Sequence, residues 1–155
     1  MSNDNTINTK EEAKKILKGY KQLLIRRNQL EKIVSKLEAE VINLKGPNYG
    51  DNSTGIGNSS ITAKIAKLVD LKNELETFED KCNSKLLEIE SVLQLVAEKD
   101  GVIYANILHF KFVDFYLLDY IAELVGYSRC QTIRYYNESL NCFYTKYKEG
   151  VVANA

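Results

Sequence analysis

Hydrophobic residues recur at alternating steps of four and three positions through the first two thirds of the chain. The first stripe runs without a breaker and comprises Ile16, Tyr20, Leu23, Arg27, Leu30, Val34, Leu37, Val41 and Leu44. The same step resumes after Ser60 as Ile61, Ile65, Leu68, Lys72, Leu75, Glu79, Cys82, Leu86, Ile89, Leu93 and Val96. This heptad step is typical of helices that pack as coiled coils. The pattern predicts two long helices, the first beginning at a capping box formed by Thr9 and Glu12.

Residues 46–60, with the sequence GPNYGDNSTGIGNSS, separate the two stripes and are predicted to form a flexible connector. Two helices of matched length joined in this way are expected to fold back as an antiparallel hairpin over residues 10–99, after a disordered start at residues 1–9. If Leu44 lies opposite Ile61, Arg27 falls opposite Glu79. The two charges then either pair and fix the register, or both extend into solvent.

The composition changes after Asp100 and Gly101. Eight of the ten tyrosines and four of the five phenylalanines lie between residues 101 and 150. We expect most of these rings to form the core of a compact domain over residues 100–149, although a stacking platform for single-stranded nucleic acid is an alternative. Helices are predicted at residues 102–112, 115–125 and 128–148, followed by a tail at residues 150–155.

The segment IAELVGYS at residues 121–128 has the pattern of a tight corner between two helices. Ala122 is small where the helices cross, Gly126 can adopt the positive φ that ends the first helix, and Tyr127 can fill the corner. Ser128 and Gln131 form a capping box for the next helix. This pattern is typical of a helix-turn-helix, whose second helix enters the DNA major groove, although a purely structural corner is the alternative.

Charge and composition narrow the function classes. The formal net charge is zero, but residues 10–27 are basic and residues 70–80 are acidic. No apolar run reaches the roughly 20 residues that span a bilayer, and the polar start lacks the apolar centre of a signal peptide. We therefore expect a cytoplasmic protein without a membrane partner.

Chemistry-bearing residues are sparse. The three cysteines, Cys82, Cys130 and Cys142, and the single His109 fit neither a disulfide framework nor a metal site, and they are expected to be packed or surface side chains. No nucleophile motif or carboxylate cluster supports catalysis. We expect no enzyme activity, no metal and no cofactor.

The last helix has two candidate inward faces. One buries Thr132, Tyr135 or Tyr136, Leu140 and Phe143; the other buries Ile133, Tyr136, Leu140, Phe143 and Tyr147. Arg134 faces outward in both. Arg, Asn and Gln side chains can each form two hydrogen bonds with the edge of one base. The candidate base-reading residues are therefore Arg129, Gln131, Arg134 and Asn137. The candidate phosphate contacts are Ser128, Lys14, Lys18, Lys21, Lys111 and Lys146.

The stretch from Ala105 to Tyr147, with its IAELVGYS corner and RCQTIRYYNESLNCFY helix, resembles region four of sigma-70-type factors. It resembles the ArpU/RinA-like phage transcriptional regulators more closely, which also place a long helical segment before this unit. The resemblance implies an activator of phage late genes that works with RNA polymerase in the cytoplasm of a bacterial host. Thr132 departs from the family pattern, which has an aliphatic residue there, and the last helix is less basic than is usual in the family.

These observations predict an all-α protein: a long antiparallel helical hairpin, or coiled coil, followed by a helix-turn-helix domain. The expected function is sequence-specific regulation of transcription on double-stranded DNA, with the hairpin forming a homodimer or touching RNA polymerase. The alternative is a coiled-coil structural or assembly protein, such as a DNA-packaging subunit or adaptor, and the zero net charge favours it.

Overall fold

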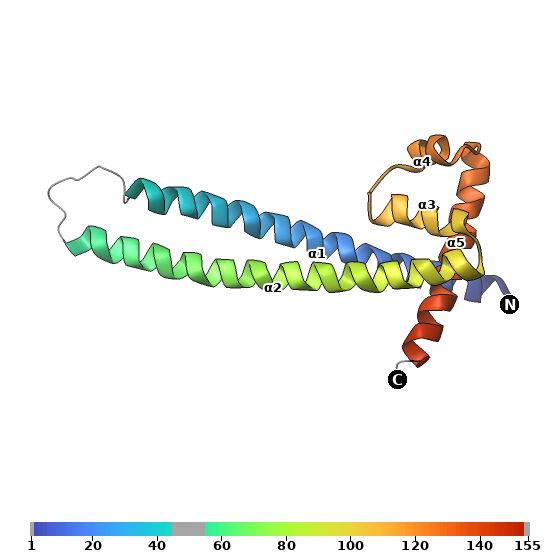
Figure 1. Cartoon of the computed structure of the whole chain (residues 1–155), viewed down its shortest axis with the longest axis horizontal. Coiled ribbons are helices and arrows are strands. Elements are labelled where there is room, and N and C mark those ends of the chain that lie inside the picture. Colours follow the sequence, from blue (N-terminus) through green and yellow to red (C-terminus); the bar gives the residue numbers. More distant parts are fainter. Residues whose placement is uncertain (1, 45–54, 154–155) are drawn as a thin grey trace. The chain divides into compact units, whose positions relative to one another are not determined.

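The computed structural model describes the backbone of residues 2–44 and 55–153, and the side chains of residues 8–43 and 60–150. Within these ranges the chain is all-α, as predicted, and it contains no strand. Its helices are α1 (Ser2–Leu44), α2 (Gly55–Lys99), α3 (Val102–Phe112), α4 (Leu118–Val125) and α5 (Arg129–Ala153), as Figure 1 shows.

Several helix ends differ from those that the sequence predicts. Helix α1 begins at Ser2 instead of at the Thr9 capping box, α2 already begins at Gly55, and α5 continues to Ala153 through much of the predicted tail. Helix α4 begins at Leu118, later than expected. Extending an existing helix costs far less than nucleating one, so long helices continue through residues that would not start one. The rest of the predicted connector, residues 46–54, lies outside the described residues.

The chain divides into two compact units. Unit 1 comprises residues 1–22 and 83–155, and unit 2 comprises residues 23–82. In the described part of unit 2, ion pairs form between segments of α1 and α2: Arg26 with Glu74, Arg27 with Glu79, Glu38 with Lys72, and Glu40 with Lys64. From Arg27 onward, the residue number of the partner in α2 decreases as the residue number in α1 increases. The two segments of this unit therefore run antiparallel.

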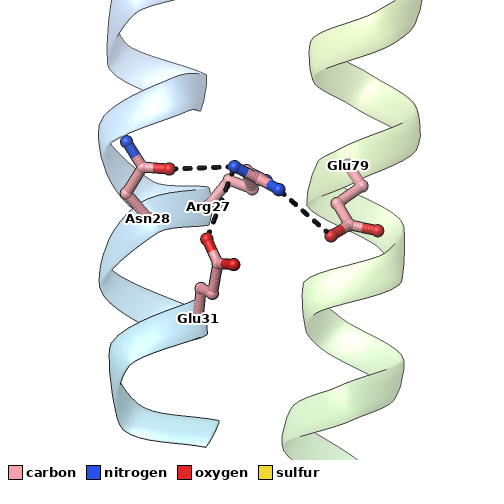
Figure 2. A network of polar contacts seen from close by, with 4 residues as sticks. All are labelled: Arg27, Asn28, Glu31 and Glu79. Atoms are coloured by element: carbon pink, nitrogen blue, oxygen red, sulfur yellow. Dashed lines mark hydrogen bonds and ion pairs between the residues drawn. The ribbon is translucent and has the colours of Figure 1, made fainter. Parts of the chain in front are cut away.

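Arg27 and Glu79 interrupt the two hydrophobic stripes of unit 2, and they meet. Arg27 Nη2 lies 3.5 Å from Glu79 Oε1, while Nη1 donates to Asn28 Oδ1 at 3.1 Å and lies 3.5 Å from Glu31 Oε2 (Figure 2). Of the two alternatives that the sequence leaves open, the structure contains the pair. It lies beside the buried Cys82, and burial raises the pKa of that thiol.

The core of unit 1 is built from all five helices. Leu17 of α1, Ile89 of α2, Leu108 of α3, Ile121 of α4 and Phe143 of α5 are buried. Polar contacts join α1 to α5 and α5 to the turn after α2: Thr9 Oγ1 lies 3.0 Å from Asn141 Oδ1, and Lys146 Nζ lies 3.6 Å from Asp100 Oδ2. The expectation that most aromatic residues between 101 and 150 form the core is wrong, because only Phe112, Tyr136 and Phe143 of the twelve are buried. Others lie in contacts between helices, such as that between Tyr104 of α3 and Tyr135 of α5.

None of the helices in the described part of the chain is long and apolar enough to cross a membrane.

Candidate nucleic-acid interface

The corner between α4 and α5 is closed by one glycine. Gly126 has φ 79° and ψ 21°, the left-handed conformation in which a side chain is strained. Its N–H donates to Ala122 O at 3.0 Å, and the Tyr127 N–H donates to the same oxygen at 3.2 Å. These two bonds satisfy a carbonyl that the helix end leaves free, in the manner of a Schellman ending. Ala122 itself is buried, as expected for a close crossing of two helices.

Ser128 caps the N-terminus of α5. Its Oγ accepts a hydrogen bond from the Gln131 N–H at 3.1 Å, which is one half of the predicted capping box. Its carbonyl oxygen accepts a second bond from Thr132 Oγ1 at 2.8 Å. The Ser128 side chain is thus an N-cap in this structure. Tyr127, in contrast, is 44% exposed and does not fill the corner; its ring lies edge-on to Tyr135 with centroids 5.2 Å apart.

The inward face of α5 is the one that contains Thr132. Its buried residues are Thr132, Tyr136, Ser139, Leu140 and Phe143. A threonine is buried on this face at little cost, because its hydroxyl donates to the carbonyl one turn earlier and leaves the methyl group for the core. Ser139 behaves in the same way and donates to Tyr136 O at 2.6 Å. The competing face, with Ile133 and Tyr147 inward, is not adopted, since both are only half-buried.

This register places the base-reading candidates in two groups. Arg129 and Arg134 are exposed, whereas Gln131 and Asn137 are half-buried. The two arginines differ in one further respect. Arg129 Nε lies 2.8 Å from Asp119 Oδ1 of α4, whereas Arg134 forms no ion pair with any residue whose side chain is described. Arg134 is therefore the cation on this face that is free to bind a ligand.

Glu138 lies one turn after Arg134 and would be its natural partner at the i, i+4 spacing. Its carboxylate is bound elsewhere, because the Tyr104 hydroxyl donates to Glu138 Oε2 at 2.9 Å. Ionising the phenol would end this donation and set a second negative charge beside the carboxylate. The hydrogen bond accordingly raises the pKa of Tyr104 to about 12. Tyr104 thus engages one oxygen of the Glu138 carboxylate, and this bond competes with a pairing of Glu138 with Arg134.

The outer side of α4 is acidic and apolar. Asp119 and Glu123 are exposed on one edge of the helix. On the other edge, large hydrophobic side chains are exposed at helical spacing, namely Leu117, Tyr120 and Leu124. Sequence reasoning missed this face, although the acidic pair and the three-and-four step of the apolar residues were readable in the sequence.

The candidate phosphate contacts also separate into groups. Lys14 lies 3.5 Å from Glu11, and Lys146 is largely covered and held by Asp100. Three lysines, Lys18, Lys21 and Lys111, line one groove of unit 1. The structure thus brings together lysines from α1 and α3 that are far apart in the sequence.

Phe115 shares the groove with these lysines, and sequence reasoning did not single it out. Its ring stacks on Tyr20 with centroids 6.1 Å apart, and Lys21 Nζ lies 5.4 Å from its centroid. It is the only non-glycine residue with positive φ, at 62°, in the part of the chain that the structure describes. No pattern in the sequence marks such a conformation at a phenylalanine.

Comparison with known protein families, with characterised proteins and with solved structures gave no match. The geometry of the described residues therefore carries any assignment of function.

Proposed function

We propose that this protein binds double-stranded DNA in a sequence-specific manner and regulates transcription, with α4 and α5 as a helix-turn-helix and α5 as the reading helix. The observation that carries the proposal is the free Arg134 on the outer face of a helix that is capped at its start. The left-handed Gly126 and the Ser128 cap fix where that helix begins. A rigid element of this kind holds its side chains in the geometry that bidentate readout of base edges needs.

Arg134 reads a base in this proposal, with Gln131 and Asn137 beside it. Arg129 is held by Asp119 in the free protein and exchanges this partner for a phosphate or a base when DNA arrives. Such an exchange costs little, because an exposed ion pair contributes only about 0 to 1 kcal/mol. Basic side chains elsewhere in unit 1 provide the attraction to phosphate that the neutral face of α5 lacks.

The long helices complete the proposal. They form an antiparallel hairpin that pairs two copies of the chain or contacts bacterial RNA polymerase. Together with the resemblance to the ArpU/RinA-like regulators, this arrangement supports an activator of phage late genes that acts in the bacterial cytoplasm.

Selection from a random library of DNA duplexes tests the proposal. The full-length chain, at low salt, is expected to enrich one sequence motif over successive rounds. Failure to enrich any motif, under conditions in which the protein is folded, would contradict sequence-specific binding.

A second candidate function is that of an assembly protein, and the outer side of α4 favours it. Exposed apolar side chains at helical spacing, beside Asp119 and Glu123, suit a protein partner better than a phosphate backbone. A chain that selects no DNA sequence, but self-associates through a contact that Leu124→Ser abolishes, would support this function instead.

A further inference from the structure

Three lysines and two aromatic rings surround one groove in unit 1. It is lined by Lys18, Lys21, Lys111, Phe112, Phe115 and Leu117, and its volume is about 160 Å³. A single water molecule needs only about 10 to 15 Å³ of cavity volume, so the groove has room for a group larger than water. It gathers residues from α1, α3 and the link between α3 and α4.

The groove is positively charged and uncompensated. No carboxylate is among the residues that line it, and none of its three lysines forms an ion pair with a residue whose side chain is described. Other lysines of the chain do have such a partner: Lys14, Lys64, Lys72, Lys85 and Lys146 each lie within 4 Å of a carboxylate. What sets the groove apart is that three unpaired lysines line one space. Three ammonium groups around one space repel each other, and an anion between them would relieve that repulsion.

Phe115 forms one wall of the groove in a conformation that costs energy. A bulky residue at positive φ persists only where its surroundings hold it, and such strain gathers at ligand sites. Tyr20 and Lys21 hold the Phe115 ring on the α1 side. Because these neighbours already engage the ring, it serves as a wall of the groove and not as a stacking platform for a base.

We propose that this groove is a phosphate-binding site, in which the ammonium groups of Lys18, Lys21 and Lys111 enclose one phosphate group. Ammonium groups bind phosphate as point charges that donate short, charge-assisted hydrogen bonds. That this phosphate belongs to the DNA backbone rests on the proposed function. That the groove binds a phosphate group does not depend on it.

Inorganic pyrophosphate, titrated into the full-length chain and followed by the shift in melting temperature, tests the site. The triple variant Lys18→Gln/Lys21→Gln/Lys111→Gln removes the groove charges. The matched control Lys32→Gln/Lys36→Gln/Lys67→Gln removes three exposed lysines of unit 2 that form no ion pair with a described side chain. Circular dichroism checks that both variants are folded.

The groove variant is expected to bind pyrophosphate at least about tenfold more weakly than the unmodified chain, and the control variant less than about twofold more weakly. An equal loss in both variants, or the absence of saturable binding to the unmodified chain, would overturn the site.

A competition with duplex DNA identifies the source of the phosphate. Displacement of pyrophosphate by a duplex of random sequence supports the DNA backbone. Binding of the duplex with pyrophosphate left in place overturns that source and assigns the groove to a small phosphorylated compound. A chain that binds pyrophosphate in the groove but no DNA at any salt concentration contradicts the proposed function while the phosphate site stands.

Discussion

Arg129 and Asp119 join the first turn of α5 to the first turn of α4 through a contact of 2.8 Å between Nε and Oδ1. Both side chains are mostly exposed, at 71% and 72%. The pair therefore contributes little to stability. It does, however, engage Arg129, the cation at the start of the proposed reading helix.

Asp119→Asn should release Arg129 and strengthen DNA binding. We expect an increase in affinity of up to about fivefold, which corresponds to the upper limit for an exposed ion pair. Loss of an acid from the first turn of α4 should lower the free energy of unfolding by about 0.3 to 1 kcal/mol. Fluorescence anisotropy with a labelled duplex measures the affinity. Asp70→Asn removes the same charge from an exposed site in unit 2 and serves as the control. Weaker binding by Asp119→Asn would mean that Asp119 positions Arg129 for its contact. Unchanged binding would mean that Asp119 does not restrain Arg129, and either result would contradict the prediction.

The hydrogen bond from Tyr104 to Glu138 predicts an alkaline titration. In the folded protein the pKa of Tyr104 is raised to about 12 from 10. The stability that this bond contributes is therefore fully present below pH 10 and is lost as the pH rises toward 12. Glu138→Gln removes the charge, and the phenol should then titrate closer to its ordinary pKa. Absorbance of tyrosinate, with Tyr104→Phe to identify the signal, measures the change. A titration that is identical with and without the Glu138 carboxylate would rule out the contact.

The same hydrogen bond should affect DNA binding. Tyr104→Phe frees Glu138 to pair with Arg134 one turn away, and competition from this pair should weaken specific binding about twofold. The double variant Tyr104→Phe/Glu138→Gln lacks the competing charge and should regain the lost affinity. If the double variant binds no better than Tyr104→Phe, Glu138 does not compete for Arg134.

Cysteine labelling reports the register of α5. Cys130 is exposed, Cys142 is half-buried and Cys82 is buried, and burial raises the pKa of the Cys82 and Cys142 thiols. Because the thiolate is the reactive form, a short exposure to iodoacetamide near neutral pH should label Cys130 first. Mass spectrometry of the digested protein gives the order. Labelling of Cys142 as fast as Cys130 would contradict the register that buries Thr132.

The all-α class and the α4–α5 corner followed from local signals. Gly126 ends α4 through its left-handed backbone conformation, and Ser128 begins α5 through a capping hydrogen bond. Both effects depend on only a few neighbouring residues. The predicted bounds of α3 are also those of the structure, since Gly101 precedes a largely apolar stretch.

Other features depend on tertiary contacts that no local pattern contains. Thr132 suits either face of a helix, because its hydroxyl can bond to the preceding turn, so both registers of α5 were open. The pair between Arg129 and Asp119 depends on how α4 and α5 cross. The conformation of Phe115 depends on Tyr20, which lies on a distant part of the chain.

The effect of Arg134→Ala on DNA recognition tests the central claim most directly. Against the motif selected by the unmodified chain, the variant should lose about 1 to 3 kcal/mol of specific binding and relax its preference at one base position, with little change in non-specific binding. Its free energy of unfolding should change by less than about 0.5 kcal/mol, because Arg134 is exposed and forms no ion pair with a described side chain. Lys36→Ala, which removes an exposed cation from unit 2, should leave the preference intact. A folded Arg134→Ala protein with full affinity and full selectivity would contradict the assignment of α5 as the reading helix.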